Sequence, residues 1–416
     1  MESGQVESLK HAMRTSALLL AALSLAVAAC APKNPPRAAA PVAKTPASLD
    51  PILQPYLAKY RLPALAAAIV QNGELVAVGA VGTRRAGADI PVTVNDRFHI
   101  GSDTKAMTAL VAAQFVDEGK LRWDITVVEV FPELAPKMDK RLRQVTLEQL
   151  LSHTSGIPSD NDALDTLIEQ GNEQPGNLDE MRYCVVERLV KMPLDSQPGT
   201  RFAYANLGYV LVGAILERKS GKTWEELVQE RVFTPLQLDT AGFGPQASLG
   251  KIDAPLAHRP QKDGALKAML AGPNGDNPPV LGPAGTAHLS VIDFATWAAW
   301  NTGEGKRGPA LVKPETMHKM HTPIIEMAPK KDAAPGTPAS GKYGLGWGEI
   351  TIPPLSPEPF VFHGGSNQMN LAYIMLQPKY DFGMVLMTNA GGTEADAGLK
   401  ALSAELYGKY GNRDSQ

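Results

Sequence analysis

Residues 97–118 read RFHIGSDTKAMTALVAAQFVDE, an extended segment followed by an apolar helical pattern. The letters RFHIG suit an extended segment. From residue 103 to 118 the sequence predicts a helix, because four apolar residues recur at the spacing of one helical face: Met107, Leu110, Val111 and Phe115. Ser102 stands where the extended segment gives way to this helix, and Lys105 follows three residues later on the same face. The stretch therefore predicts a hydroxyl and an amine side by side at a helix N-terminus.

This pair suggests nucleophilic catalysis. A serine hydroxyl is a weak nucleophile until a base takes its proton. An amine that loses its charge in a desolvated cleft can be that base, and a helix N-terminus favours a developing alkoxide. A second pattern, Tyr204-Ala-Asn206, stands just before another predicted helix at 207–219. Tyr204 could share the proton, and the amide of Asn206 could hold both Lys105 and a substrate carbonyl.

A third pattern, His363-Gly-Gly365, precedes a predicted strand. Gly364 and Gly365 would let the strand backbone approach a substrate closely. The backbone N–H groups of Ser102 and Ser366 could then stabilise an oxyanion. Each short pattern recurs elsewhere in the chain, as in Ser248-Leu-Gly-Lys251. Context distinguishes the copies, because Ser102 opens an apolar helical pattern and Ser248 does not.

The remaining sequence predicts strands at both ends of the chain and helices between them. Apolar runs surround Asn72-Gly73 and residues 378–381, which predicts two hairpins. Helices are expected at 49–61, 290–300 and 394–408, and Thr146 and Thr223 open two capping boxes. Residues 245–285 and 328–341 are expected to be loops, because Gly, Pro and polar residues dominate them. The predicted fold class is α/β (α+β), an antiparallel sheet from both chain ends with flanking helices and a mostly helical insertion at roughly 120–335.

These patterns resemble the serine β-lactamase and penicillin-binding-protein superfamily on its class C side, which includes DD-peptidases, D-aminopeptidases and family VIII carboxylesterases. Further stretches share the resemblance: residues 150–156 (LLSHTSG), 197–206 (QPGTRFAYAN), 282–285 (GPAG) and 343–348 (YGLGWG). The resemblance covers residues 49–408 and implies that Ser102 is acylated, that Lys105 and Tyr204 transfer its proton, and that Asn206 contacts the substrate. Either Lys105 or Tyr204 can be the base. The resemblance implies hydrolysis without metal or cofactor.

The third pattern departs from the class C lactamases, which usually carry Lys-Thr-Gly where this chain has His363-Gly-Gly365. A lysine suits a substrate carboxylate, whereas histidine is largely neutral at pH 7. The chain is therefore expected to be a serine hydrolase acting on a small ester, an amide or a D-amino acid peptide, with esterase, peptidase and β-lactamase activities left open. The alternative is a catalytically weak lipoprotein that binds penicillin or peptidoglycan fragments. His153 is expected to hold a turn by hydrogen bonds.

The N-terminus predicts export and lipidation. Residues 17–29 (ALLLAALSLAVAA) form a short apolar run behind Arg14, so residues 1–29 read as a signal peptide. The run ends at Cys30 in a pattern that resembles the bacterial lipobox, so Cys30 is the expected lipidation site. Residues 30–48 are a Pro/Ala-rich linker and 49–412 the hydrolase domain. We expect a periplasmic protein anchored by lipid, with the outer membrane favoured by analogy with enteric bacteria.

Charge and cysteine content exclude other classes. The chain of 416 residues carries 40 Lys and Arg against 43 Asp and Glu, so no positive excess is available for a nucleic-acid backbone. Its two cysteines cannot build a disulfide scaffold or a four-cysteine zinc site. No nucleic-acid partner is expected.

Overall fold

The computed structural model describes residues 45–411 except residues 160, 273 and 354. The predicted signal peptide, the predicted lipidation site Cys30 and the linker up to residue 44 lie outside the described residues. Within the described part of the chain, no helix is long and apolar enough to cross a membrane.

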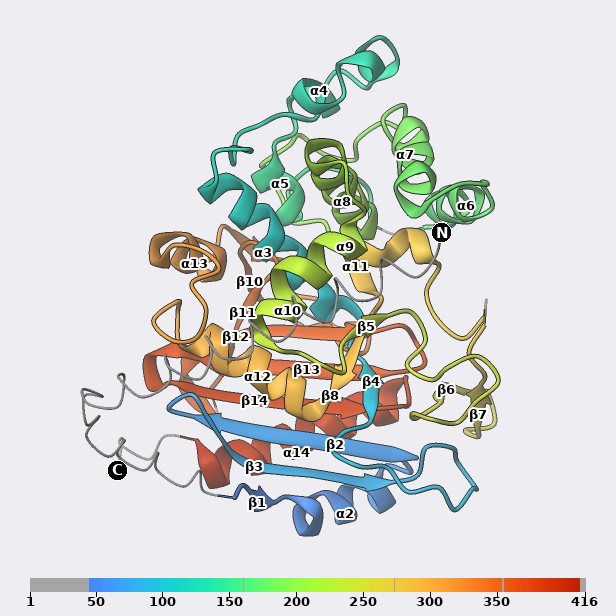
Figure 1. The fold of residues 1–416 in the computed structure, drawn as a ribbon, viewed down its shortest axis with the longest axis vertical. Coiled ribbons are helices and arrows are strands. Elements are labelled where there is room, and N and C mark those ends of the chain that lie inside the picture. The colour runs from blue at the N-terminus through green and yellow to red at the C-terminus, as the bar shows by residue number, and fades with distance from the viewer. Residues whose placement is uncertain (1–44, 160, 273, 354, 412–416) are drawn as a thin grey trace, which may run out of the picture. The chain divides into compact units, whose positions relative to one another are not determined.

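A nine-stranded sheet forms the base of the domain, in the order β1-β3-β2-β14-β13-β12-β11-β10-β9 (Figure 1). Its strands are β1 (Ala47–Ser48), β2 (Ala64–Gln71), β3 (Glu74–Gly82), β9 (Ile325–Met327), β10 (Gly341–Tyr343), β11 (Gly348–Ile352), β12 (Ser356–Ser366), β13 (Leu371–Gln377) and β14 (Phe382–Thr388). The pairing is antiparallel except between β1 and β3. Strand β14 pairs with β2, with Leu386 opposite Ala67, so the prediction of one sheet built from both chain ends is confirmed.

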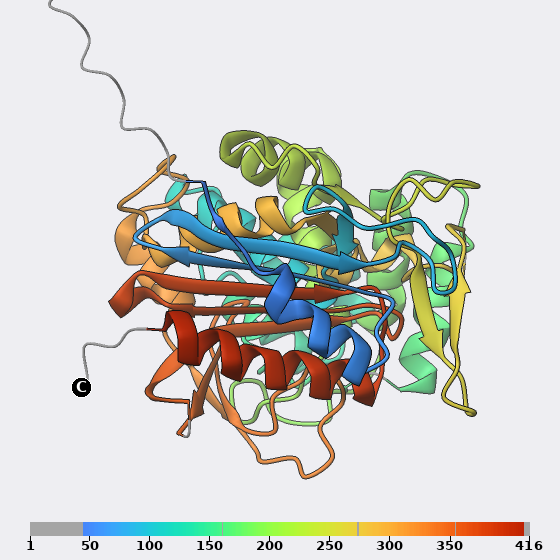
Figure 2. The same cartoon turned by 90° about the horizontal axis from the view of Figure 1, so that it is seen from below.

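Both faces of the sheet are covered, which explains why its central strands read as continuous apolar runs rather than as alternating patterns. Helices α2 (Asp50–Lys59) and α14 (Thr393–Tyr410) lie on one face (Figure 2), where Leu386 and Leu399 belong to one hydrophobic core. On the other face Val385 belongs to a core shared with α3 (Thr104–Asp117) and α12 (Val291–Thr302). The predicted helices and both predicted hairpins are present.

The insertion between β3 and β9 is mostly helical and stands on one side of the sheet (Figure 1). Besides α3 and α12 it contains α4 (Val127–Val130), α5 (Leu147–Leu151), α6 (Asp162–Asn172), α7 (Leu178–Leu189), α8 (Asn206–Ser220), α9 (Trp224–Val228), α10 (Thr234–Leu236), α11 (Gly282–Gly285) and α13 (Pro314–His321). Short turns of helix are η1 (Gly101–Asp103), η2 (Pro132–Lys137), η3 (Leu142–Gln144), η4 (Gln229–Phe233) and η5 (Pro279–Leu281), and η6 (Pro378–Tyr380) lies in the second hairpin. The capping boxes at Thr146 and Thr223 are both formed.

Two expectations were wrong. Residues 245–285 are not simply loop, because β6 (Ala257–Pro260) and β7 (Leu266–Met269) form a hairpin there, followed by η5 and α11. Buried His258 fixes this hairpin through a hydrogen bond of 3.0 Å to the carbonyl oxygen of Asn389, a tertiary contact with no local signal. Ala47 and Ser48, assigned to the linker, form β1, because edge pairing uses backbone groups and needs no apolar side chain.

A second sheet joins β4 (Arg97–His99), β8 (Ala287–Ser290) and β5 (Gly242–Phe243). Strand β4 carries the chain directly into η1 and α3, so it sets the position of the residues that follow it.

Candidate active site

Ser102 and Lys105 meet as the sequence predicts, at the start of the buried helix α3. Gly101 turns the chain out of β4 with a φ of +51°, a conformation that glycine adopts without strain. Ser102 then lies in η1, and Lys105 lies in the first turn of α3. The ammonium nitrogen of Lys105 is 3.1 Å from the hydroxyl oxygen of Ser102. This hydroxyl therefore has a potential proton acceptor within hydrogen-bonding distance.

Lys105 is fully buried, and oxygens from α8 and α11 hold it in place. Its Nζ donates to Oδ1 of Asn206 at 2.6 Å and to the carbonyl oxygen of Ala284 at 2.7 Å. The same nitrogen lies 4.8 Å from the ring centre of Tyr204. A buried amine without such partners would be strongly destabilising. The sequence analysis did not assign the contact with Ala284, although Ala284 stands in the GPAG stretch that supported the resemblance.

Tyr204 reaches Lys105 from the extended segment before α8, and His153 holds that segment. Nδ1 of His153 accepts a hydrogen bond of 3.2 Å from the backbone N–H of Ala205, and the imidazole lies 4.2 Å from the Tyr204 ring, centre to centre. Burial, reinforced by the charge of Lys105, lowers the pKa of His153 well below its usual value, which keeps the ring neutral. The sequence analysis expected His153 to hold a turn by hydrogen bonds, whereas its imidazole hydrogen-bonds to a segment distant in the chain.

Strand β12 reaches the nucleophile from the sheet side, and two glycines make the approach possible. A Cβ on Gly365 would lie 1.8 Å from the carbonyl oxygen of Ile100 and 2.6 Å from the backbone nitrogen of Ser102. A Cβ on Gly101 would lie 2.4 Å from the backbone nitrogen of Ser366. The two backbones thus touch, and the amides of Ser102 and Ser366 come from adjoining segments.

His363 lies in β12 beside this contact and is almost completely buried. Its Nε2 is 2.9 Å from the hydroxyl of Tyr343, and its Nδ1 is 3.0 Å from the carbonyl oxygen of Gly364. Burial, together with the nearby charge of Lys105, lowers the pKa of His363 to about 3. The imidazole is therefore neutral at pH 7, as the sequence analysis expected for this position.

Asp103 is a buried group that the sequence analysis did not single out. Its Oδ1 lies 3.6 Å from Nδ1 of His363, and burial raises the pKa of Asp103 well above the usual range, although the charge of Lys105 opposes the shift. Both pKa shifts favour the uncharged forms of Asp103 and His363 on this side of the site. Its position next to Ser102 in sequence was the only signal that could have indicated it.

A cavity of about 720 Å³ opens over the nucleophile. Its lining includes six of the eight predicted catalytic or substrate-contacting residues, namely Ser102, Tyr204, Asn206, His363, Gly364 and Ser366. Lys105 and Gly365 are absent from the lining. Among residues 45–411, as far as they are described, no group of three His, Cys, Asp or Glu side chains could hold a metal ion.

Comparison with known proteins supports the class of protein that the sequence patterns resemble. The beta-lactamase family model matches residues 49–409. Penicillin-binding protein 4 of Amycolatopsis lactamdurans is 26% identical over 339 residues, which cover 80% of this chain and 82% of that protein. Other curated relatives are longer, and this chain spans 62% of their length.

Two solved structures share the fold. The octameric penicillin-binding protein homologue from Pyrococcus abyssi superimposes with a TM-score of 0.68 at 27% identity, over 85% of this chain and 76% of that one. A D-stereospecific amidohydrolase from Streptomyces sp. gives a TM-score of 0.63 at 21% identity, over 84% and 95% of the two chains. The fold and the match over most of its length place this chain in the beta-lactamase family, whose members are serine hydrolases.

Proposed function

We propose that this protein hydrolyses esters or amides through an acyl-enzyme formed on Ser102. The single observation that carries the proposal is the 3.1 Å contact between the buried Lys105 ammonium nitrogen and the Ser102 hydroxyl, at the floor of the cavity. A hydroxyl with an adjacent proton acceptor, itself oriented by a third group, is the arrangement that nucleophilic catalysis requires. Asn206 supplies that third group.

The proposed reaction has two steps. The Ser102 oxygen attacks the substrate carbonyl carbon, and its proton passes to Lys105 in its uncharged amine form or to Tyr204 in its phenolate form. The negative charge that develops on the carbonyl oxygen is stabilised by the N–H groups of Ser102 and Ser366. The proton then goes to the departing alcohol or amine, the bond to that group breaks, and the acyl group stays on Ser102. Water, deprotonated by the same pair, attacks the acyl-enzyme and releases the acid.

The charge of the cavity favours substrates without a carboxylate beside the bond that is cleaved. The imidazole of His363 is neutral, so it cannot pair with a carboxylate as a lysine at this position would. Two cations do line the cavity, Arg201 and Lys330, but both are exposed, and Arg201 lies 3.9 Å from Asp195. Exposed charges contribute little to the binding of an ion. We therefore favour an esterase or an amidase that acts on substrates without a carboxylate beside the cleaved bond over an efficient β-lactamase.

The test combines trapping with a matched substrate panel. Wild-type protein is expected to gain one fluorophosphonate adduct in intact mass spectrometry, and Ser102→Ala none. In the panel, short p-nitrophenyl esters and a D-Ala-D-Ala peptide amidated at its C-terminus are expected to turn over faster than the same peptide with a free carboxylate. Equal labelling of Ser102→Ala would refute the acyl-enzyme. Faster cleavage of the free carboxylate would refute the preference for uncharged substrates, and acylation without turnover of any substrate would favour a binding lipoprotein.

We also propose that Cys30 carries the lipid anchor, since the apolar run at residues 17–29 ends directly before it. In a bacterial host that processes lipoproteins, Cys30→Ser is expected to abolish incorporation of labelled palmitate and to move the protein from the membrane pellet to the soluble fraction. Cys184→Ser is the matched control, because Cys184 lies in α7 of the folded domain. Unchanged labelling of Cys30→Ser would contradict the anchor.

A further inference from the structure

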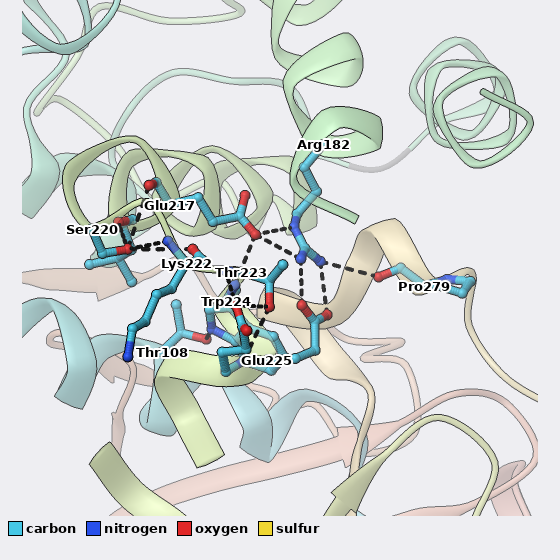
Figure 3. Close-up of polar contacts among 11 residues, drawn as sticks. Thr108, Arg182, Glu217, Ser220, Lys222, Thr223, Trp224, Glu225 and Pro279 are labelled. Atoms are coloured by element: carbon cyan, nitrogen blue, oxygen red, sulfur yellow. Dashed lines mark hydrogen bonds and ion pairs between the residues drawn. The ribbon is translucent and has the colours of Figure 1, made fainter. Parts of the chain in front are cut away.

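A buried polar network connects α7, α8 and α9 to Thr108 of α3 and to Pro279 of η5 (Figure 3). At its far end the guanidinium of Arg182, fully buried in α7, pairs with two carboxylates. Its Nε donates to Glu217 at 2.9 Å, and its two terminal nitrogens lie 3.0 Å and 2.5 Å from the oxygens of Glu225. Charges buried in this way persist only when every partner is in place. The network therefore fixes three helices relative to one another.

Arg182 also contacts the segment of η5 and α11 that leads to the active site. One of its terminal nitrogens lies 3.4 Å from the carbonyl oxygen of Pro279, at the start of η5 (Figure 3). A Cβ on Gly282 would lie 2.7 Å from a Glu225 oxygen, so α11 begins in direct contact with the same cluster. Helix α11 has only four residues and cannot be stable by itself. Its position must come from such contacts.

Thr108 holds the other end of this segment. Its hydroxyl donates to the carbonyl oxygen of Pro283 at 2.7 Å and accepts from the indole N–H of Trp224 at 3.0 Å. The backbone N–H of Trp224 in turn donates to Glu217 at 2.9 Å, which closes the connection to Arg182. A hydroxyl has one hydrogen to donate, so this arrangement uses that hydrogen on α11.

The geometry couples Thr108 to the catalytic lysine. Pro283 and Ala284 are consecutive residues of α11, and both of their carbonyl groups face α3. Thr108 bonds to the first carbonyl, and Lys105, one turn earlier in α3, bonds to the second. Fixing the Pro283 carbonyl thereby fixes the Ala284 carbonyl, and with it one of the oxygens that direct the ammonium of Lys105 toward Ser102.

We propose that Thr108 is a positioning residue for Lys105, and that the Arg182–Glu217–Glu225 cluster supports it through Trp224 and Pro279. This role rests on the proposed acyl-enzyme mechanism. Thr108 is not part of the cavity lining and bonds to Pro283, so its effect on the reaction passes through α11.

The test compares Thr108→Val, which keeps the shape of the side chain but removes the hydroxyl, with Thr108→Ser, which keeps the hydroxyl. We expect Thr108→Val to lower the rate at which a fluorophosphonate phosphonylates Ser102 with loss of fluoride, and kcat for a p-nitrophenyl ester, by about 10- to 100-fold with little change in KM. Small misplacements of reacting groups have effects of this size. Thr108→Ser is expected to restore most of the rate. Thr296→Val, which removes an exposed helical hydroxyl bonded to Ile292, is the control for the substitution itself.

A pH profile separates positioning from a general loss of structure. Weakening the contact with Ala284 removes an acceptor that favours the charged amine, so the limb of the kcat/KM profile that depends on Lys105 is expected to move to lower pH in Thr108→Val. The proposal would be overturned if Thr108→Val kept its rates within twofold of wild type and its pH profile did not shift. It would also be overturned if Thr108→Ser lost as much rate as Thr108→Val. If Thr108→Val does not fold, Thr108→Ala takes its place as the variant without a hydroxyl and is compared with Thr108→Ser. Failure of wild type to acylate would refute the proposed function instead.

Discussion

Lys105→Met is expected to lower kcat/KM for ester hydrolysis by about 10³-fold while the protein stays folded, since positioned proton transfer contributes roughly 10²- to 10⁴-fold. Methionine fills a similar volume but has no nitrogen to receive the Ser102 proton. The loss is expected in kcat rather than in KM, because Lys105 lies beneath the cavity and not in its lining.

Stability should respond much less than activity to this substitution. The change removes a fully buried amine, which is unfavourable by itself, but it leaves the acceptors on Asn206 and Ala284 without their donor. These effects oppose each other, so we expect the Tm to move by only a few degrees. Lys379→Met, at an exposed lysine paired with Glu358, is the control. Near-normal activity of Lys105→Met with a normal melting curve would contradict the role of Lys105 in proton transfer.

Gly365→Ala is expected to lower kcat by about 10²- to 10³-fold, the effect of losing one oxyanion-hole donor. The new methyl group would lie 1.8 Å from the carbonyl oxygen of Ile100, so β12 must move away from η1. That movement separates the amide of Ser366 from that of Ser102. The same overpacking should lower the free energy of unfolding by about 1–3 kcal/mol.

Gly408→Ala provides the matched control for this substitution. Gly408 lies in α14, and a Cβ there would have no atom within 4 Å. Alanine is better than glycine in a helix, by up to about 1 kcal/mol, so this variant should be slightly more stable and fully active. Activity and melting temperature are measured on both proteins. A Gly365→Ala protein that acylates as fast as wild type would show that the Ser366 amide does not stabilise the oxyanion.

Much of the fold could be predicted because its signals are local. The apolar face at 103–118 defined α3, the Asn72-Gly73 turn defined the first hairpin, and Thr146 and Thr223 marked two helix starts through capping boxes. The β6–β7 hairpin was missed, although Asp263-Gly264 marks its turn, because its strands contain no β-branched or aromatic residue and a contact from distant Asn389 helps to hold it.

The features of the site likewise divide into those that local sequence predicts and those that depend on distant segments. The spacing of Ser102 and Lys105 within one helical turn determined by itself that a hydroxyl and an amine would meet, since helical geometry fixes that distance. The burial of Lys105, the strongly lowered pKa of His363 and the carbonyl of Ala284 beside the amine arise only in the tertiary structure. Desolvation and hydrogen bonding depend on which distant segments surround a group, and α11, β12 and α8 lie far from α3 in the chain.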